Sequence, residues 1–254
     1  MPPPLSGSLF AFEDHMLYIG PLQDTARHAH HAAQVLWVPE QGVELQVGAL
    51  PRERYSLAVI PADVPHTHGS APWAAMLWVD AAYAAHLQPV RQAQPSGTQP
   101  KHTAGPALPR QPTPQQAATL ARALHAHLHS ASAAQQPTLQ ARHPAAQRMC
   151  ALLNEVAEAS SAQAPQLERL AHRAGLSPRQ MRSVFARDTG LSPQAYLRWR
   201  RLRVAVQQIT QGASLTAAAV TAGFADGAHF CRVFRAQFGM PPKQALLSLH
   251  LDRG

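Results

Sequence analysis

The stretch AHRAGLSPRQMRSVFARDTGLSP (residues 171–193) returns later in the chain as AVTAGFADGAHFCRVFRAQFGMPP (residues 219–242). The offset is 48 residues up to the glycine of the turn, from Gly175 to Gly223, and 49 residues after it, so the second copy carries one inserted residue. Such self-similarity is typical of a repeated structural unit. In each copy a helix with apolar periodicity ends at the glycine, and a second helix follows a short turn. The pattern predicts two helix-turn-helix units.

The segment between the copies predicts one further helix over residues 193–211. Apolar residues recur along it at helical spacing and form one stripe; they are Tyr196, Trp199, Leu202, Val206 and Ile209. At about 1.5 Å per residue this helix is roughly 25 Å long, which sets the two units close to one duplex turn, about 34 Å, apart. The arginines of this helix are spread around its circumference. We expect some of them to pair with Asp188 or Asp226 in the same domain.

Both copies and the joining helix resemble the DNA-binding domain of the AraC/XylS family of transcription regulators. The most specific part is Gly-Phe-x-Asp-x-x-His-Phe-x-Arg-x-Phe-x-x-x-Phe-Gly-x-x-Pro over residues 223–242, with Ala228 where a serine is usual. The resemblance extends from near residue 143 to near residue 247. It implies a sequence-specific transcription regulator, with double-stranded promoter DNA and RNA polymerase as partners. The resemblance is compatible with an activator or a repressor of transcription.

Helix geometry then selects the side chains that would meet DNA. In the first unit Met181, Val184 and Phe185 fall on one buried stripe, and in the second unit Phe230, Val233 and Phe234 do the same. The outward residues are the predicted DNA contacts: Arg179, Arg182 and Ser183 in the first unit, and Gly227, Ala228, Cys231 and Arg232 in the second. The matching positions of the first unit contact bases or nearby phosphates in the family. Because Arg232 is the strongest hydrogen-bond donor of the second set, the first unit is expected to carry more of the sequence information.

The net charge of +8 is unevenly distributed. Residues 1–110 carry 6 Lys and Arg against 8 Asp and Glu, whereas residues 111–254 carry 16 against 6. The basic half is therefore the half that contains the repeat. A basic face supplies the salt-sensitive part of DNA affinity that does not depend on sequence. An architectural DNA binder without sequence preference is the alternative for this half, and the paired units argue against it.

Short strands separated by turns are predicted for the N-terminal part. The candidates are residues 9–12, 16–19, 34–38, 43–47, 55–60 and 75–79. Prolines and glycines separate them, and many short strands at near-even spacing indicate a small barrel or sandwich.

Two histidine-containing stretches resemble the two motifs of the cupin barrel. They are His28-x-His30-His31 and Pro61-x-Asp-x-Pro65-His66-x-His68. The same resemblance extends to the compact cupin-like sensor that precedes this DNA-binding domain in many AraC-type proteins. The chain departs from the motifs at Asp63, where glycine is usual, and after the histidine pair, where Gln34 is nearest to the expected glutamate.

Imidazoles of His28, His30 and His66 could converge on a transition metal, since this ligand type suits Ni, Cu, Fe or Zn. The alternative is that these rings line an apolar pocket, so that the effector is a small molecule. The alternative function is a metal-binding cupin enzyme fused to a DNA-binding domain. We do not predict an enzyme, because the N-terminal half lacks a full ligand set with an acid or base beside it.

The predicted fold class is α+β, with a small cupin-like β-barrel followed by an all-α domain. The predicted boundaries are residues 8–87 for the sensor domain, 88–143 for a proline-rich linker and 144–247 for the DNA-binding domain. Within the linker, a helix over residues 115–129 serves either a homodimer interface or packing on its own barrel. Two cysteines give no disulfide framework, and apolar runs stay short of about 18 residues. We therefore expect a cytoplasmic protein.

Overall fold

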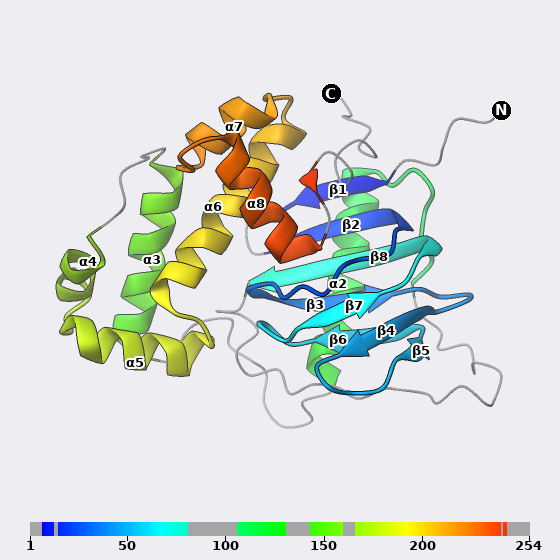
Figure 1. Ribbon diagram of the computed structural model, residues 1–254, viewed down its shortest axis with the longest axis horizontal. Coiled ribbons are helices and arrows are strands. Elements are labelled where there is room, and N and C mark those ends of the chain that lie inside the picture. Colours follow the sequence, from blue (N-terminus) through cyan, green and yellow to red (C-terminus); the bar gives the residue numbers. More distant parts are fainter. Residues whose placement is uncertain are drawn as a thin grey trace.

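The computed structural model describes residues 7–12, 15–80, 106–130, 143–159, 166–239 and 241–242. An antiparallel β domain comes first, and helices follow beside it and behind it (Figure 1). The predicted α+β class is confirmed. Residues 88–105 of the predicted linker and its segment 131–142 lie outside the described residues.

In the described part of the chain, eight strands form two sheets. The larger sheet has the order β1-β2-β8-β3-β6, and the smaller sheet has the order β5-β4-β7. The strands are β1 (Ser8–Ala11), β2 (His15–Leu22), β3 (Ala32–Trp37), β4 (Val43–Val47), β5 (Glu53–Tyr55), β6 (Leu57–Ile60), β7 (His66–His68) and β8 (Ala71–Asp80). Each predicted strand segment overlaps an observed strand. Strand β7 was not predicted, because two of its three residues are histidines and it carries no apolar alternation.

The larger sheet is covered on both faces. Successive side chains of a strand point to opposite faces, so along β8 Met76 and Trp78 face one hydrophobic cluster, whereas Leu77 and Val79 face another. The second cluster includes the apolar side of α2 (Pro114–Ser130), which lies behind the sheet in Figure 1. Burial on both faces explains the nearly continuous apolar sequence of β8.

Helix α2 packs on the sheet of its own chain. This is one of the two alternatives predicted for the segment, the other being a homodimer interface. Its buried residues are Ala117, Leu120, Ala121 and Leu124. The exposed side carries Gln115, Thr119 and Arg122, which are polar. The described part of this helix therefore presents no apolar stripe to a second copy of the chain.

The C-terminal helices follow the two copies of the repeat. They are α3 (Pro144–Glu158), α4 (Leu167–Arg173), α5 (Pro178–Thr189), α6 (Pro193–Thr210), α7 (Leu215–Thr221) and α8 (Gly227–Phe238). Helices α4 and α5 form the first helix-turn-helix unit, and α7 and α8 form the second. Among the described residues, no helix is both long and apolar enough to cross a membrane.

Local signals set the ends of the second helix in each unit. Ser177 and Gln180 form a capping box at the start of α5, where Pro178 occupies the first turn. Asp226 caps α8 by accepting a hydrogen bond from the amide of His229 at 2.6 Å. Both helices end at a glycine with positive φ, 74° at Gly190 and 70° at Gly239, a conformation that glycine adopts without steric cost.

Candidate nucleic-acid interface and effector site

The first candidate reading face lies on α5. Met181 and Phe185 are buried, and the ring of Phe185 lies edge-on to that of Tyr196 on α6, with centroids 5.5 Å apart. This packing fixes the rotation of α5 about its own axis. As a result Arg179, Arg182 and Ser183 are all exposed near the start of the helix. The structure brings these three predicted residues together on one face.

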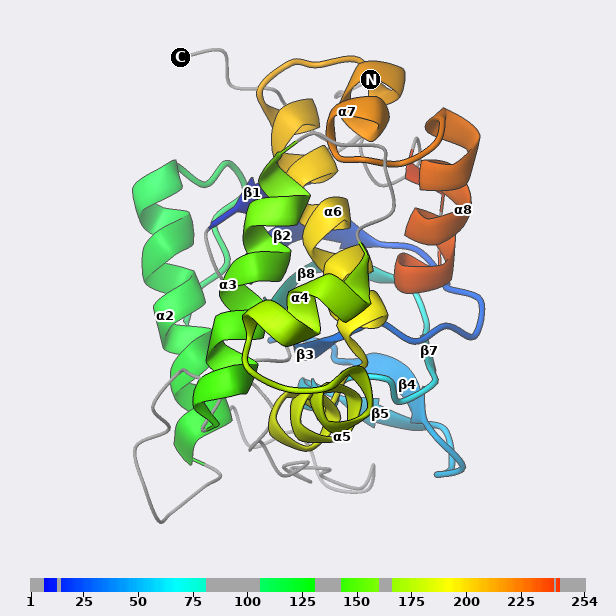
Figure 2. The ribbon, with the colours of Figure 1, turned by 90° about the vertical axis from the view of Figure 1, so that its left-hand side faces the viewer.

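The second candidate reading face lies on α8 and is less polar. Phe230 and Phe234 are buried, which turns the four predicted residues outward. Of these, Ala228 and Arg232 are exposed, whereas Gly227 and Cys231 are half-buried. Arg232 therefore remains the strong hydrogen-bond donor among the residues predicted for this face. Figure 2 shows α5 at one end of α6 and the α7–α8 pair beside the rest of that helix.

The three histidines of the candidate metal site lie together in the β domain. One ligand atom from each of His28, His30 and His66 can be chosen so that all lie within 4.8 Å of one another. Main-chain hydrogen bonds between residues 28 and 66 join the two motifs at this point. The two histidine-containing stretches therefore lie side by side, as expected. The number of residues between the stretches did not by itself indicate this contact.

Hydrogen bonds orient two of these rings. The Nδ1 of His28 donates to the carbonyl of Ala26, and the Nδ1 of His66 donates to the carbonyl of Val64, both at 2.9 Å. A carbonyl oxygen only accepts, so the Nε2 of each of these two rings keeps its lone pair. This arrangement, a main-chain acceptor on one ring nitrogen and a free lone pair on the other, is common in metal-ligating histidines.

Burial keeps these imidazoles neutral. Desolvation, together with a smaller repulsion from neighbouring imidazoles, lowers the pKa of His30 to about 4 and that of His66 to about 2. A neutral imidazole is the form that binds metals. Within the described residues, the buried Nε2 of His66 has no hydrogen-bond partner.

The side chain of Gln34 lies beside the histidine cluster. Its Oε1 lies 2.7 Å from the Nε2 of His30, whose Nδ1 lies 2.7 Å from the carbonyl of Ala32. The polar group beside His30 is thus an uncharged amide.

The departure from the motif at Asp63 has a conformational explanation. Asp63 has a φ of 59°, in the left-handed region where glycine is strongly favoured. Aspartate is one of the residues that tolerate this region, and its Oδ1 bonds the Nδ1 of His31 at 2.5 Å. Aspartate at this position therefore preserves the turn. It also binds His31, which is not part of the three-histidine cluster.

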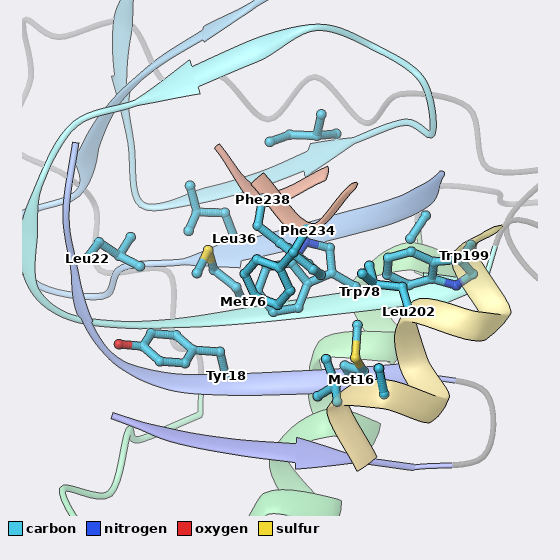
Figure 3. Close-up of a cluster of buried hydrophobic side chains, with 14 of the residues drawn as sticks. Met16, Tyr18, Leu22, Leu36, Met76, Trp78, Trp199, Leu202, Phe234 and Phe238 are labelled. Atoms are coloured by element: carbon cyan, nitrogen blue, oxygen red, sulfur yellow. The ribbon is translucent and has the colours of Figure 1, made fainter. Parts of the chain in front are cut away.

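A cavity of about 180 Å³ opens beside the histidines, between the β domain and the C-terminal helices. We call it the junction cavity. Leu22, Met76 and Trp78 line it from the sheet, and Val206 of α6 with Phe234 and Phe238 of α8 line it from the helices. Figure 3 shows the two phenylalanines lying against Trp78 and Met76.

One end of the junction cavity is polar, and His28, Gln34 and His68 line that end. Burial lowers the pKa of His68 to about 4, so this ring is also neutral at pH 7. Sequence reasoning did not include His68 among the candidate site residues. It also missed the cavity, because part of the wall comes from α6 and α8 of the DNA-binding domain and no local spacing connects that domain to the sheet.

A buried ion cluster joins the two domains near the cavity. Asp80, at the end of β8, accepts hydrogen bonds from the indole of Trp199, from Arg200 at 3.1 Å and from Arg203 at 2.7 Å. These three donors all lie on α6. The expectation that arginines of this helix pair with Asp188 or Asp226 was wrong for Arg200 and Arg203.

Both of the expected partners are engaged elsewhere. The carboxylate of Asp188 accepts the main-chain N–H of His143 at 2.5 Å, and Asp226 caps α8. Each aspartate therefore satisfies main-chain donors near it in space. The arginines turn instead toward the fully buried carboxylate of Asp80 on the β domain.

Comparisons with known proteins agree with this arrangement. Residues 170–247 match the family described as a helix-turn-helix domain. The chain is 38% identical over 84 residues to the HTH-type transcriptional activator RhaS of Escherichia fergusonii, and this match spans 33% of the chain and 30% of RhaS. The two predicted helix-turn-helix units are thereby confirmed as a domain of this type.

Solved structures extend the likeness to the whole fold. An apo ToxT variant from Vibrio cholerae superimposes with a TM-score of 0.61 at 9% identity, covering 94% of this chain and 99% of that one. ToxT of the same organism bound to an unsaturated fatty acid gives a TM-score of 0.54 at 8% identity, covering 94% and 97%. At such identities the likeness shows the fold alone.

Proposed function

We propose that this chain, whose residues 170–247 form a helix-turn-helix domain of the AraC/XylS type, is a sequence-specific DNA-binding transcription regulator. One observation carries the proposal: the same unit occurs on both sides of α6, and each second helix exposes an arginine on its outer face. In helix-turn-helix proteins the start of the second helix contacts base edges in the major groove. Two such helices on one chain would read two adjacent segments of the groove.

The two units would contribute unequally to specificity. Arg179 and Arg182 on α5 each offer a planar guanidinium that can bind the O6 and N7 of guanine together, and Ser183 adds a hydroxyl. On α8 the small side chains of Gly227 and Ala228 allow close approach, with Arg232 as the polar contact. We therefore assign most base readout to the first unit and mainly phosphate contact to the second.

We assign effector sensing to the β domain, with the junction cavity as the site for a small molecule. The cavity supports this role because residues of both domains line it, so that an occupant would touch α8, which carries one set of DNA contacts. The ToxT structure with an unsaturated fatty acid shows that a protein of this fold holds a small ligand. The regulator would act in the cytoplasm, contact RNA polymerase to activate transcription, and form any homodimer through a surface other than the described face of α2.

A metal ion is the second candidate effector, favoured by the histidine cluster. His28, His30 and His66 would hold it, with Gln34 as an oxygen ligand, and the bound ion would link the two cupin motifs. Elemental analysis of the purified chain tests this, with a His66→Ala variant and His31→Ala as a matched control outside the cluster. Stoichiometric metal that is lost in the first variant alone supports a metal sensor. A metal-free wild-type chain removes that candidate, together with the metal-dependent enzyme.

The experiment that tests the regulator is a genome-wide crosslinking map of the chain in its own cells. We expect a few sharp peaks, each containing two short sequence boxes about one helical turn apart. An Arg182→Ala variant should lose the peaks while its protein level stays unchanged. Diffuse occupancy by the wild-type chain would contradict sequence-specific binding and would favour the architectural alternative.

A further inference from the structure

The two helix-turn-helix units belong to different hydrophobic cores. The first unit packs with α3 and the beginning of α6, and its cluster includes Met149, Leu153, Met181, Phe185 and Tyr196. From the β domain, the partly buried Ala62 touches the edge of that cluster. The first unit therefore has a core built from its own domain.

The second unit shares its core with the β domain. One continuous cluster contains Phe230, Phe234 and Phe238 of α8 together with Met16 and Trp78 of the larger sheet. The ring of Phe238 meets Trp78 edge-on, with centroids 5.2 Å apart (Figure 3). A change in the interior of the β domain is thus a change in the packing of α8.

The C-terminal end of α8 is also held by the connection between β2 and β3, which carries His28, His30 and His31. The side-chain oxygen of Gln237 accepts the main-chain N–H of His31 at 2.8 Å. At Gly239 a Cβ atom would lie 2.7 Å from the Nδ1 of His28. The two segments of the chain therefore approach too closely to leave room for a side chain at residue 239. Packing and hydrogen bonding both fix this end of the recognition helix to the β domain.

The junction cavity lies inside that shared core. Phe234 and Phe238 form part of its wall, and Val206 adds a contribution from α6. None of the described residues of the first-unit core lines the cavity. An occupant would therefore touch the second unit directly and would reach the first unit only through α6.

The wall of the cavity also defines the class of occupant. Of the described residues that line it, none is Asp, Glu, Lys or Arg, and aromatic and aliphatic side chains predominate. The polar end offers imidazoles and an amide, which exchange hydrogen bonds with a hydroxyl or carbonyl group. An apolar cavity of roughly 150 Å³ accepts benzene, so a cavity of about 180 Å³ suits one ring with a small polar substituent.

We propose that the junction cavity binds a small uncharged single-ring molecule, and that its occupancy acts on the second helix-turn-helix unit and leaves the first unit unchanged. This inference rests on the proposed function and adds to it the class of effector and the unit that responds. A ligand between two walls binds best when both walls are in place, so it stabilises the docked position of α8. The first unit keeps its own core and remains able to bind its DNA box.

Hydrogen–deuterium exchange on the full chain tests the proposal, with phenol as the uncharged probe and benzoate as a charged probe of similar shape. At a phenol concentration about ten times its Kd, amides of α8 that exchange by undocking should slow by about tenfold. Amides of α5 should exchange at an unchanged rate. Equal slowing of α5 and α8 overturns the selective effect. Absence of slowing by phenol, or equal slowing by benzoate, overturns the class of occupant.

A cavity-filling variant supplies the matched comparison. Leu22→Phe places extra volume in the cavity, whereas Leu50→Phe makes the same change at a leucine that is 40% exposed and away from it. The phenol effect on α8 should disappear in the first variant and persist in the second. Persistence in both variants would place phenol elsewhere and overturn the proposal.

DNA binding separates this inference from the function on which it rests. Operators taken from the crosslinking peaks are tested with one box scrambled at a time, and Arg182→Ala and Arg232→Ala assign each box to a unit. Phenol should change the affinity for the second unit's box at least threefold and leave the first unit's box unchanged. Equal changes overturn the inference alone, whereas absence of specific binding to the intact operator removes the proposed function.

Discussion

Arg182 combines exposure with a fixed position, since its neighbour Met181 is buried in the first-unit core. We expect Arg182→Ala to lower the affinity for the preferred operator and to relax one base preference by about 1–3 kcal/mol, because a two-point contact with guanine is lost. Titration of the variant against operators changed at one base pair at a time measures both effects. Arg54→Ala removes the same charge from the β domain and should leave base preference intact. An unaltered preference in Arg182→Ala would show that another residue reads that base.

The two cysteines differ in reactivity. Burial raises the pKa of Cys150 to about 12, so almost no thiolate, the reactive form, is present at pH 8. Cys231 on α8 is half-buried at the edge of the shared core. An aromatic disulfide reagent should therefore modify one thiol of the native chain and both after unfolding in urea. Operator DNA should slow the native reaction, and Cys231→Ser should abolish it; modification of Cys150 in the native chain would contradict this assignment.

At the scale of elements, the contact between β8 and α6 includes one buried carboxylate beside its apolar packing. Asp80 is fully buried and is shared by Arg200 and Arg203. Asp80→Asn keeps the shape but removes the negative charge from between two guanidiniums. Removal of one partner of a buried ion pair costs about 3–5 kcal/mol. The free energy of unfolding, measured by urea titration, should fall by an amount of this order.

Glu158 provides the control for that measurement, because it pairs with the same guanidinium from an exposed position. Its Oε1 lies 3.7 Å from Arg200, and its side chain is 65% exposed. Exposed ion pairs contribute about 0–1 kcal/mol, so Glu158→Gln should leave the free energy of unfolding almost unchanged. Equal losses in the two variants would mean that burial of Asp80 does not strengthen the cluster.

For the whole molecule, charge is divided between the two halves of the chain. The half that contains the repeat carries 16 basic and 6 acidic residues, whereas residues 1–110 carry 6 and 8. We expect the logarithm of the DNA association constant to fall linearly with the logarithm of salt concentration. For about 6–10 neutralised phosphates, the loss between 50 and 200 mM salt is about 10³–10⁵-fold. Fluorescence anisotropy with operator and scrambled duplexes checks this; a salt-independent affinity would argue against phosphate contact by the basic half.

Features encoded by nearby residues were predictable from the sequence. The capping serine at residue 177, the proline that follows it and the glycine of each turn placed the helices of both units, since caps and turns depend on local backbone chemistry. Alternating apolar residues indicated most strands of the β domain in the same way. The spacing of His28 and His30 and the later His66 marked the histidine cluster, once the barrel topology was assumed from the motifs.

The sequence by itself thus determined the repeated units, the α+β class and the candidate residues on α5, α8 and the histidine motifs. Only the tertiary structure decided that Asp80 pairs with arginines about 120 positions away, and that Phe234 and Phe238 close a cavity against Trp78. Neither contact leaves a trace in local periodicity. A buried charge is matched by whichever opposite charge the packed domains bring to it, and a cavity exists only where two separately specified surfaces fail to fill the space between them.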